Sequence, residues 1–248
     1  MDEIQISLVF GTYNRLKMLK KCIESIRNNG IEAPYEIVVI DGGSTDGTGK
    51  WLIRQNDILS IFEHNRDRWT KKPKRSWAYA YNLGYKCAQG KYVAQLNDDI
   101  LIRASALQEA YEFMEQQSQD VGACAFPFRD RPDEDKYKVG TTLGGKMFVN
   151  FGYYRKDVLE KVGFLDEKTY AFYHADGDLG LKIWNEGYRV VMCPDARIDH
   201  FPKYRSDRVR KANYKLAQEN RDWEKYIGKW KETFVGEANP GGWIILDV

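Results

Sequence analysis

The sequence contains two adjacent carboxylates, Asp98 and Asp99, which follow Asn97 at the end of an apolar run. Adjacent carboxylates after a buried strand repel each other and lose hydration unless a positive charge lies close by. A hard divalent cation that keeps coordination positions open for phosphate is one solution. An acidic turn or a helix N-cap is the other, because Asn and Asp are favoured at both. The residues alone leave the two interpretations equally open.

Two further polar segments follow apolar runs in the same way. Residues 41–48 read DGGSTDGT, and residues 11–15 read GTYNR. The carboxylate of Asp41 could accept a hydrogen bond from a ring N–H of a nucleobase, or the segment could be only a glycine-rich turn. Tyr13 could stack on a base. Neither segment has the G-x-G-x-x-G of dinucleotide folds or the G-x-x-x-x-G-K-[ST] of a P-loop, so those two binding modes are excluded.

Alternating strand and helix patterns position these three segments. We expect strands at 4–10, 35–40, 58–62 and 91–96, and helices at 16–29, 45–55 and 76–89. This order indicates βαβ units and a largely parallel sheet. Parallel sheets bind ligands outside the carboxyl ends of their strands. The order therefore predicts that all three polar segments open onto one crevice.

The second half of the chain is less regular. Its expected elements are a helix at 105–117 with Ser105 as a possible N-cap, a strand at 121–126, a charged loop at 129–138, helices at 156–162 and 179–186, a strand at 188–193, and a basic, aromatic, helical segment at 205–232. We expect one domain over 1–202, with a nucleotide-binding half at 1–100 and an acceptor-binding half at 101–202. A C-terminal helical extension, 203–248, is expected to pack on it.

Composition narrows the class of protein. The 248 residues include 38 Lys and Arg against 36 Asp and Glu, a net charge of +2, with 43% hydrophobic residues. These values indicate a globular protein and exclude disorder, collagen and coiled coil. The balanced charge gives no case for a nucleic-acid binder.

The sequence also bears on where the protein is located. No apolar run approaches the ~20 residues of a membrane span, and the first residues are acidic, unlike those of a signal peptide. The four cysteines form no C-x-x-C pair. We expect a cytoplasmic protein with reduced thiols.

Together the segments resemble a known family. GTYNR, DGGSTDGT, AYNLG at 80–84 and NDD at 97–99 are similar to the motifs of the inverting glycosyltransferases of family 2, and the resemblance resumes at 162–167 and 176–179. It implies an α/β GT-A fold, with a Rossmann-like βαβ nucleotide-binding half and a mixed, mainly parallel sheet. It also implies transfer of a sugar from a nucleoside-diphosphate donor, UDP first, to a hydroxyl of a saccharide, lipid-linked or protein-linked acceptor.

The resemblance assigns roles to individual residues. Asp99 would hold Mn²⁺ or Mg²⁺ on the diphosphate, and His200 either joins it or is a surface histidine. Arg75 either meets the diphosphate or belongs to a solvated basic loop. The residues implied in nucleotide binding are Thr12, Tyr13, Arg15, Asp41, Arg75, Asn82, Asn97 and Asp98.

Asp176 matches the family's catalytic base, which takes the proton of the acceptor hydroxyl. The acid that usually precedes it is replaced here by Ala175. On the residues alone, Asp176 or Asp178 could instead cap the helix expected at 179–186. The stretch at 144–154 would border the acceptor, through Asn150, Phe151 and Gly152, or would form an ordinary core strand.

Two other functions remain open at this point. The chain could be a weak or inactive homologue that keeps the nucleotide-sugar site, because the acid before Asp176 is lost. It could also be a sugar nucleotidyltransferase, although GTYNR lacks the glycines of that class. The basic and aromatic segment 205–230 could contact a membrane surface, a lipid-linked acceptor or a partner, or could pack on the domain and close the site.

Overall fold

The computed structural model describes residues 3–67, 69, 72–130, 135–202, 207–234 and 241–247. The larger sheet formed by these residues has the strand order β10-β6-β9-β4-β1-β2-β3. All neighbouring pairs are parallel except those of β9, which runs antiparallel to β4 and β6. The mixed, mainly parallel sheet expected from the sequence is therefore confirmed. Its strands are β1 Ile6–Thr12, β2 Tyr35–Asp41, β3 Ile58–Phe62, β4 Tyr92–Asn97, β6 Val121–Ala125, β9 Gly152–Arg155 and β10 Arg189–Met192.

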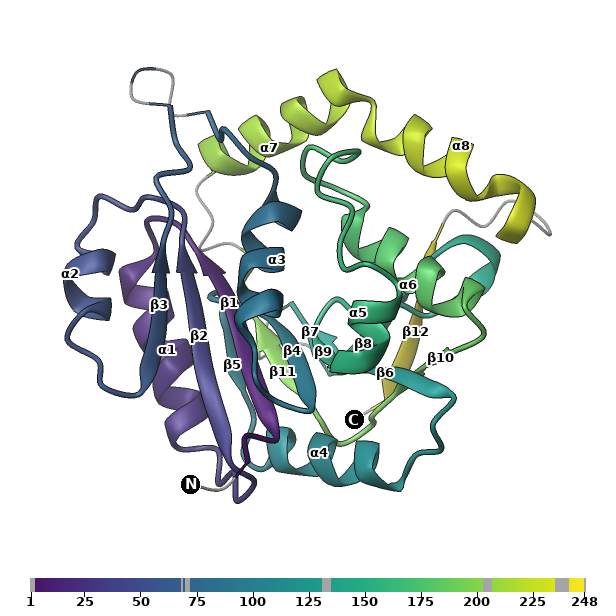
Figure 1. Cartoon of the computed structure of the whole chain (residues 1–248), viewed down its shortest axis with the longest axis horizontal. Helices are drawn as coiled ribbons and strands as arrows, with labels where there is room; N and C mark the ends of the chain where they lie inside the picture. Colours follow the sequence, from purple (N-terminus) through teal and green to yellow (C-terminus); the bar gives the residue numbers. More distant parts are fainter. Residues whose placement is uncertain are drawn as a thin grey trace.

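Helices cover both faces of this sheet (Figure 1). Strand side chains alternate between the two faces, so Leu8 and Phe10 of β1 pack on one side and Val9 on the other. Helices α1 and α4 bury their apolar stripes on the first side, and α3, α5 and α6 on the second. The helices are α1 Leu16–Arg27, α2 Thr48–Leu52, α3 Trp77–Cys87, α4 Ala106–Gln116, α5 Lys156–Lys161, α6 Ala175–Asn185, α7 Asp207–Asn220 and α8 Asp222–Phe234.

The strand register brings the three polar segments together. Thr12 pairs with Asp41 across β1 and β2, and Gly11 pairs with Asn97 across β1 and β4. The carboxyl ends of these strands therefore meet at one edge of the sheet. Helices α7 and α8 extend across the same side of the molecule in Figure 1.

A smaller sheet in the second half differs from the sequence expectation. Its strand order is β12-β8-β7-β11-β5. The expected loop at 129–138 contributes to β7 and β8, while 131–134 lie outside the described residues. The C-terminal extension was expected to be helical; it contains two helices, α7 and α8, and also a strand, β12, antiparallel to β8. Pairing between distant segments creates these strands, so local pattern misses them. They are β5 Ile100–Ile102, β7 Phe128–Arg129, β8 Lys136–Thr141, β11 Ile198–His200 and β12 Gly242–Asp247.

The start of one helix differs from expectation, and the capping of another is weaker than expected. Helix α6 begins at Ala175, four residues earlier than the pattern indicates, with His174 as its N-cap. Asp176 and Asp178 therefore lie in its first turn, and the expectation that one of them caps the helix is wrong. Ser105 does precede α4, but its side chain makes no capping hydrogen bond. Among the described residues, no helix is both long and apolar enough to cross a membrane.

Candidate active site

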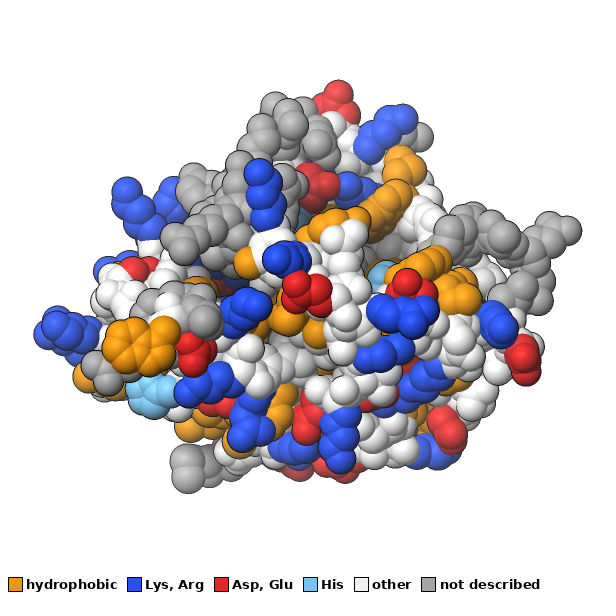
Figure 2. Space-filling view, turned by 90° about the horizontal axis from the view of Figure 1, so that it is seen from above, with side chains coloured by type: hydrophobic (Ala, Val, Ile, Leu, Met, Phe, Trp, Pro, Cys, Tyr) orange, Lys and Arg blue, Asp and Glu red, His pale blue; other side chains and the backbone are white. Residues whose placement is uncertain are grey.

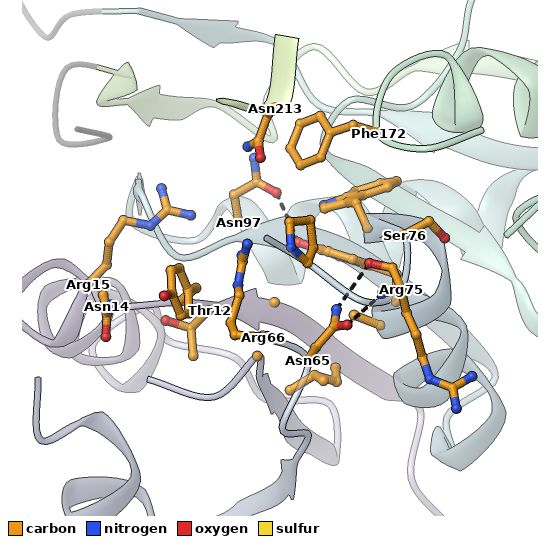
Figure 3. A pocket seen from close by; sticks show the side chains of 18 residues that line it. Thr12, Asn14, Arg15, Asn65, Arg66, Arg75, Ser76, Asn97, Phe172 and Asn213 are labelled. Atoms are coloured by element: carbon orange, nitrogen blue, oxygen red, sulfur yellow. Dashed lines mark hydrogen bonds between the residues drawn. The ribbon is translucent and has the colours of Figure 1, made fainter. Parts of the chain in front are cut away.

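A cavity of about 280 Å³ opens at the carboxyl ends of β1, β2 and β4. Figure 3 shows that its walls come from the strand ends, from the segment before α3, and from Phe172 and Asn213. Lys and Arg side chains are numerous on the face of the molecule seen from above (Figure 2). The polar and aromatic wall residues include Thr12, Tyr13, Asn14, Arg15, Asn65, Arg66, Arg75, Ser76, Trp77, Tyr81 and Asn97.

Arg15 binds both members of the acidic pair beside this cavity. Its guanidinium nitrogens lie 2.5 Å from Asp98 Oδ1 and 2.5 Å from Asp99 Oδ2, and both carboxylates are fully buried. Burial alone would lower the pKa of Arg15, but the two carboxylate charges outweigh it and raise that pKa. Thr12 Oγ1 also donates to Asp98 Oδ2 at 2.7 Å. Adjacent buried carboxylates are thus held by one cation from the GTYNR segment.

His200 completes this cluster from β11. Its Nδ1 lies 2.9 Å from Asp130 Oδ1, and its Nε2 lies 3.7 Å from Asp99 Oδ1. Nε2 is buried and has no hydrogen-bond partner among the described residues. When Nδ1 donates to Asp130, the lone pair of Nε2 faces Asp99, which is how metal-binding histidines are commonly oriented.

This arrangement fits a divalent cation. The described residues contain no group of three or more His, Cys, Asp or Glu that would form a complete metal site. A cation bound by Asp99 and His200 would take its remaining ligands from a diphosphate and water, as Mg²⁺ usually does. The burial of the Nε2 atom without a hydrogen-bond partner is the observation that favours the fit.

Tyr13 and Arg66 form the aromatic and cationic wall of the cavity. The Arg66 guanidinium lies 3.9 Å from the centre of the Tyr13 ring, and burial lowers the pKa of Arg66. Its Nε atom is buried without a hydrogen-bond partner among the described residues. In Figure 3 the side chain stands in the middle of the cavity. Sequence reasoning missed Arg66, because its only signal was a basic loop.

Arg75 lines the cavity but directs its charge elsewhere. Figure 3 shows its guanidinium pointing away from the other wall residues. It lies 4.2 Å from the Tyr79 ring centre and 3.5 Å from Glu63 Oε1. The backbone of Arg75 is tied to Asn65, whose Oδ1 accepts from Arg75 N at 2.7 Å and whose Nδ2 donates to Arg75 O at 3.2 Å. Arg66 is therefore the better placed of the two arginines.

Asp41 and Asn82 are buried and do not line the cavity. Asp41 Oδ1 accepts from Ser44 N at 3.0 Å, so the carboxylate shapes the turn that presents Gly42. Burial raises the pKa of Asp41. The Asn82 amide donates to Leu165 O at 2.9 Å and to Glu167 Oε2 at 2.8 Å. Both residues brace walls of the site in this structure.

Asn97 faces the cavity beside Tyr81. The Tyr81 hydroxyl lies 2.9 Å from Asn97 Oδ1 and 2.6 Å from Leu96 O. The Tyr81 ring lies 4.3 Å from that of Trp77, centre to centre, as their four-residue spacing predicts. Tyr81 is buried, whereas Trp77 is half-buried and forms part of the wall.

Asp176 lies in the first turn of α6, on the side of the sheet that α3 covers. Burial raises its pKa, while a hydrogen bond from Gly177 N to Oδ1, 2.9 Å long, and the nearby His174 lower it. Burial raises the pKa of Tyr85 and Tyr154, two tyrosines of that face, and the negative charge of Asp176 raises it further. Asp176 does not line the cavity, but Phe172, four residues earlier, does.

The three acceptor candidates lie around the start of β9. Phe151 is buried and packs 5.0 Å from the Phe128 ring centre. Gly152 is in the middle of the sheet, and a Cβ there would lie 2.0 Å from Cys124 O. Asn150 is half-buried, and its Oδ1 has no hydrogen-bond partner among the described residues. Asn150 is thus the one of the three with both a free polar atom and partial exposure.

Phe172 and Asn213 are wall residues that sequence reasoning missed. Asn213 comes from α7 and Phe172 from the segment before α6, and Figure 3 shows them side by side above the strand ends. No motif marks either residue. Only the packing of the C-terminal helices over the sheet edge brings them to the cavity.

The model of Glycosyl transferase family 2 matches residues 7–178, so the chain belongs to this family. Glycosyltransferase GlyG of Streptococcus pneumoniae is 27% identical over 125 residues, covering 49% of this chain and 38% of GlyG. The poly(ribitol-phosphate) beta-N-acetylglucosaminyltransferase TarP of Staphylococcus aureus is 27% identical over 118 residues, covering 47% of this chain and 35% of TarP. The chain thus spans well under half the length of either relative.

Solved structures show the same fold. The mannosyltransferase PcManGT from Pyrobaculum calidifontis, in complex with GDP-Man and Mn²⁺, superposes with a TM-score of 0.66 at 20% identity, covering 97% of this chain and 67% of that one. TarS residues 1–349 from S. aureus, in complex with UDP, superposes with a TM-score of 0.62 at 16% identity, covering 80% and 60%. The predicted GT-A fold is confirmed.

Proposed function

We propose that this protein transfers a sugar from a nucleoside-diphosphate donor to a hydroxyl acceptor with inversion, using a divalent metal ion. One observation carries the proposal: Arg15, which lines the cavity at the carboxyl ends of β1, β2 and β4, also binds the buried Asp98 and Asp99, and His200 lies next to Asp99. Membership of family 2 supports the reaction class. The neighbours described above hold UDP or GDP-Man, and UDP is the first base to test.

The donor would lie along the cavity with its base against Tyr13 and its diphosphate toward the acidic cluster. Tyr13 offers an aromatic face, and Gly42 and Thr12 form the wall beside it. Arg66 offers a guanidinium whose Nε is not satisfied by the protein. A charge-assisted hydrogen bond from Arg66 to the diphosphate would satisfy that atom. Two further contacts remain predictions: that of the base with Asp41 and that of the ribose with Asp98.

Asp99 and His200 would hold Mn²⁺ or Mg²⁺. When bound, the ion neutralises charge on the departing nucleoside diphosphate, a contribution of several kcal/mol to the transition state. Arg15 keeps one oxygen of Asp99 engaged, at 2.5 Å from Oδ2, while Oδ1 faces His200. Arg15 therefore orients the carboxylate that would meet the ion.

Asp176 would act as general base. The acceptor oxygen attacks the anomeric carbon, the bond from that carbon to the diphosphate oxygen breaks, and the hydroxyl proton passes to an Asp176 carboxylate oxygen. Gly177 N already binds Oδ1, which leaves Oδ2 for the proton. Burial raises the pKa of Asp176, so its ionised form is a stronger base than an exposed aspartate.

Thermal melting with nucleotides tests the donor assignment. UDP, GDP and dTDP are added with and without Mn²⁺, and the melting temperature is recorded. Ligand at 100 times its dissociation constant stabilises by about 2.7 kcal/mol, a rise of roughly 5–10 °C at this size. A nucleotide that stabilises only with metal then selects the sugar donors for a turnover assay. No response to any nucleotide with Mn²⁺ contradicts the proposal.

A further inference from the structure

Asp222, the first residue of α8, is a buried carboxylate that binds backbone amides of a distant segment. It is 1% exposed. Its Oδ1 accepts from Ala171 N at 2.9 Å, and its Oδ2 accepts from Phe172 N at 2.9 Å and from Tyr173 N at 3.0 Å. The side-chain amide of Asn220 donates to Oδ1 at 2.6 Å. Four N–H donors thus surround one carboxylate.

The carboxylate of Asp222 binds amides outside its own helix. An Asp at the N-cap of a helix commonly binds the free amides of its own helix, and Asp222 lies one residue after the N-cap position. Here the carboxylate instead accepts hydrogen bonds from amides some fifty residues earlier in the chain. Asn220 adds a second tie to the same segment, because its Nδ2 also lies 2.9 Å from Thr169 O. The junction of α7 and α8 is therefore built to hold the segment 169–173.

The segment held by Asp222 leads from the cavity to the proposed base. Phe172 lines the cavity, and Asp176 follows four residues later in α6. Between them His174 has a left-handed backbone, φ 70°, which is strained for a residue with a side chain. Its ring stacks on Tyr226 of α8, with centres 5.2 Å apart and planes at 17°.

Helix α8 also contacts α6 at a residue that follows the proposed base. Asp178 is fully buried, accepts from Trp230 Nε1 at 2.7 Å, and lies 2.7 Å from Lys229 Nζ. Tyr226 hydrogen-bonds to Thr142 in the same region. Asp176 is therefore placed between two points that α8 fixes, one before it at 171–173 and one after it at Asp178.

We propose that Asp222 is a positioning residue for sugar transfer. By holding the amides of 171–173 it fixes the direction in which α6 presents Asp176. The proposal rests on the proposed role of Asp176, because Asp222 acts through it and touches no reacting atom. The C-terminal helices are then part of the catalytic apparatus.

Hydrogen exchange of the full chain tests the structural part of the proposal, that Asp222 holds the amides of 171–173. Asp222→Asn keeps the shape of the side chain but replaces one acceptor oxygen with a donor. Amides of 171–173 should exchange faster in this variant, while amides of β1 and β4 keep their protection. Asp222→Glu keeps the carboxylate and should restore part of the protection. Unchanged exchange at 171–173 in Asp222→Asn overturns the proposal.

Kinetics with the donor selected by the melting screen test the functional half. We expect kcat of Asp222→Asn to fall about 10- to 100-fold, since a misplacement of 1 Å can cost that much, with a smaller change in donor KM. Asp222→Glu should recover part of kcat. Glu224→Gln, an exposed position in the same turn, is the matched control and should keep wild-type kcat. A kcat of Asp222→Asn equal to that of the control overturns the proposal.

The double variant with Asp176→Asn separates the two proposals. If Asp222 acts through Asp176, the double variant should turn over no more slowly than Asp176→Asn alone. A multiplicative loss in the double variant shows that Asp222 acts by another route and overturns this proposal. A wild-type rate in Asp176→Asn alone instead removes Asp176 as the base, and so contradicts the proposed function itself.

Discussion

The proposed site has a nucleotide side, at the carboxyl ends of β1, β2 and β4, and a transfer side, around Asp176. These two sides are held in place by different kinds of contact. On the nucleotide side, Thr12, Asn97 and Asp98 stand at or just beyond the ends of neighbouring strands, and backbone pairing fixes their separation. On the transfer side, Asp176 lies in the first turn of α6, and Asp222 of α8 binds the backbone amides of the segment before that helix. A sheet edge keeps its geometry when one side chain changes, whereas a segment held by a few side chains depends on each of them. Binding and turnover should therefore respond to different mutations.

The sharpest break between the two sides is expected from Asp176→Asn. Removing a general base costs about 10²- to 10⁴-fold in rate. Turnover should therefore fall by at least about 100-fold, while the rise in melting temperature with nucleotide and Mn²⁺ stays as in the wild type. Turnover is measured with the donor selected by the melting screen. Unchanged turnover would falsify the role of Asp176.

On the nucleotide side, Asp99→Ala should abolish the part of the nucleotide melting shift that depends on Mn²⁺. The physical reason is loss of the carboxylate that faces His200 Nε2.

A second variant, Asp130→Asn, changes the group that orients His200. It should weaken Mn²⁺ binding about 10- to 100-fold. Isothermal titration of Mn²⁺ in the presence of the nucleotide checks both. A metal response that survives Asp99→Ala would place the ion elsewhere.

Arg15→Gln should destabilise the fold by about 3–5 kcal/mol, because it leaves two buried carboxylates without the cation that bridges them. The matched control is Arg27→Gln, which removes an exposed pair with Asp57 and should cost about 0.2–1 kcal/mol. Urea unfolding monitored by circular dichroism measures both. Equal costs for the two variants would show that the nucleotide side does not depend on this cation.

The raised pKa of Asp176 has two consequences for pH dependence. The folded state binds the proton more tightly than the unfolded chain, so this group's contribution to stability is fully present below the unfolded pKa. That contribution is lost as the pH rises through the folded pKa. At neutral pH, Asp176→Asn should therefore melt above the wild type. The wild-type rate should fall as the pH drops through the same folded pKa. Melting and rate profiles from pH 4 to 8 measure both, and a variant that melts lower at pH 7 contradicts the burial argument.

The smallest effect is expected where the two sides meet. Asn213 of α7 lines the nucleotide cavity beside Phe172. Asn213→Ala should weaken nucleotide binding about 2- to 10-fold, the value of one ordinary hydrogen bond, and leave the Mn²⁺ requirement unchanged. Titration calorimetry with the selected nucleotide checks this. A loss confined to turnover would place Asn213 on the transfer side instead.

Local sequence pattern predicted correctly that the three polar segments meet at one edge of the sheet. The three polar segments follow strands whose apolar runs are short and whose intervening helices are amphipathic, so their meeting at one sheet edge follows from βαβ order alone. The identity of the cationic wall residue did not follow. Arg66 and Arg75 belong to the same basic loop, and only the backbone ties between Asn65 and Arg75 decide which guanidinium faces the cavity.

The sequence by itself determined the α/β class, the crevice at the strand ends and the acidic pair beside it, because these depend on periodicity and on the order of neighbouring elements. Only the tertiary structure decided which cation bridges Asp98 and Asp99, where α6 begins, and that α7 supplies a residue of the cavity wall. Those features depend on contacts between segments far apart in the chain, and Asp222 meets its amide partners some fifty residues away. No local pattern records such a contact, since its energy exists only once the sheet and helices have packed.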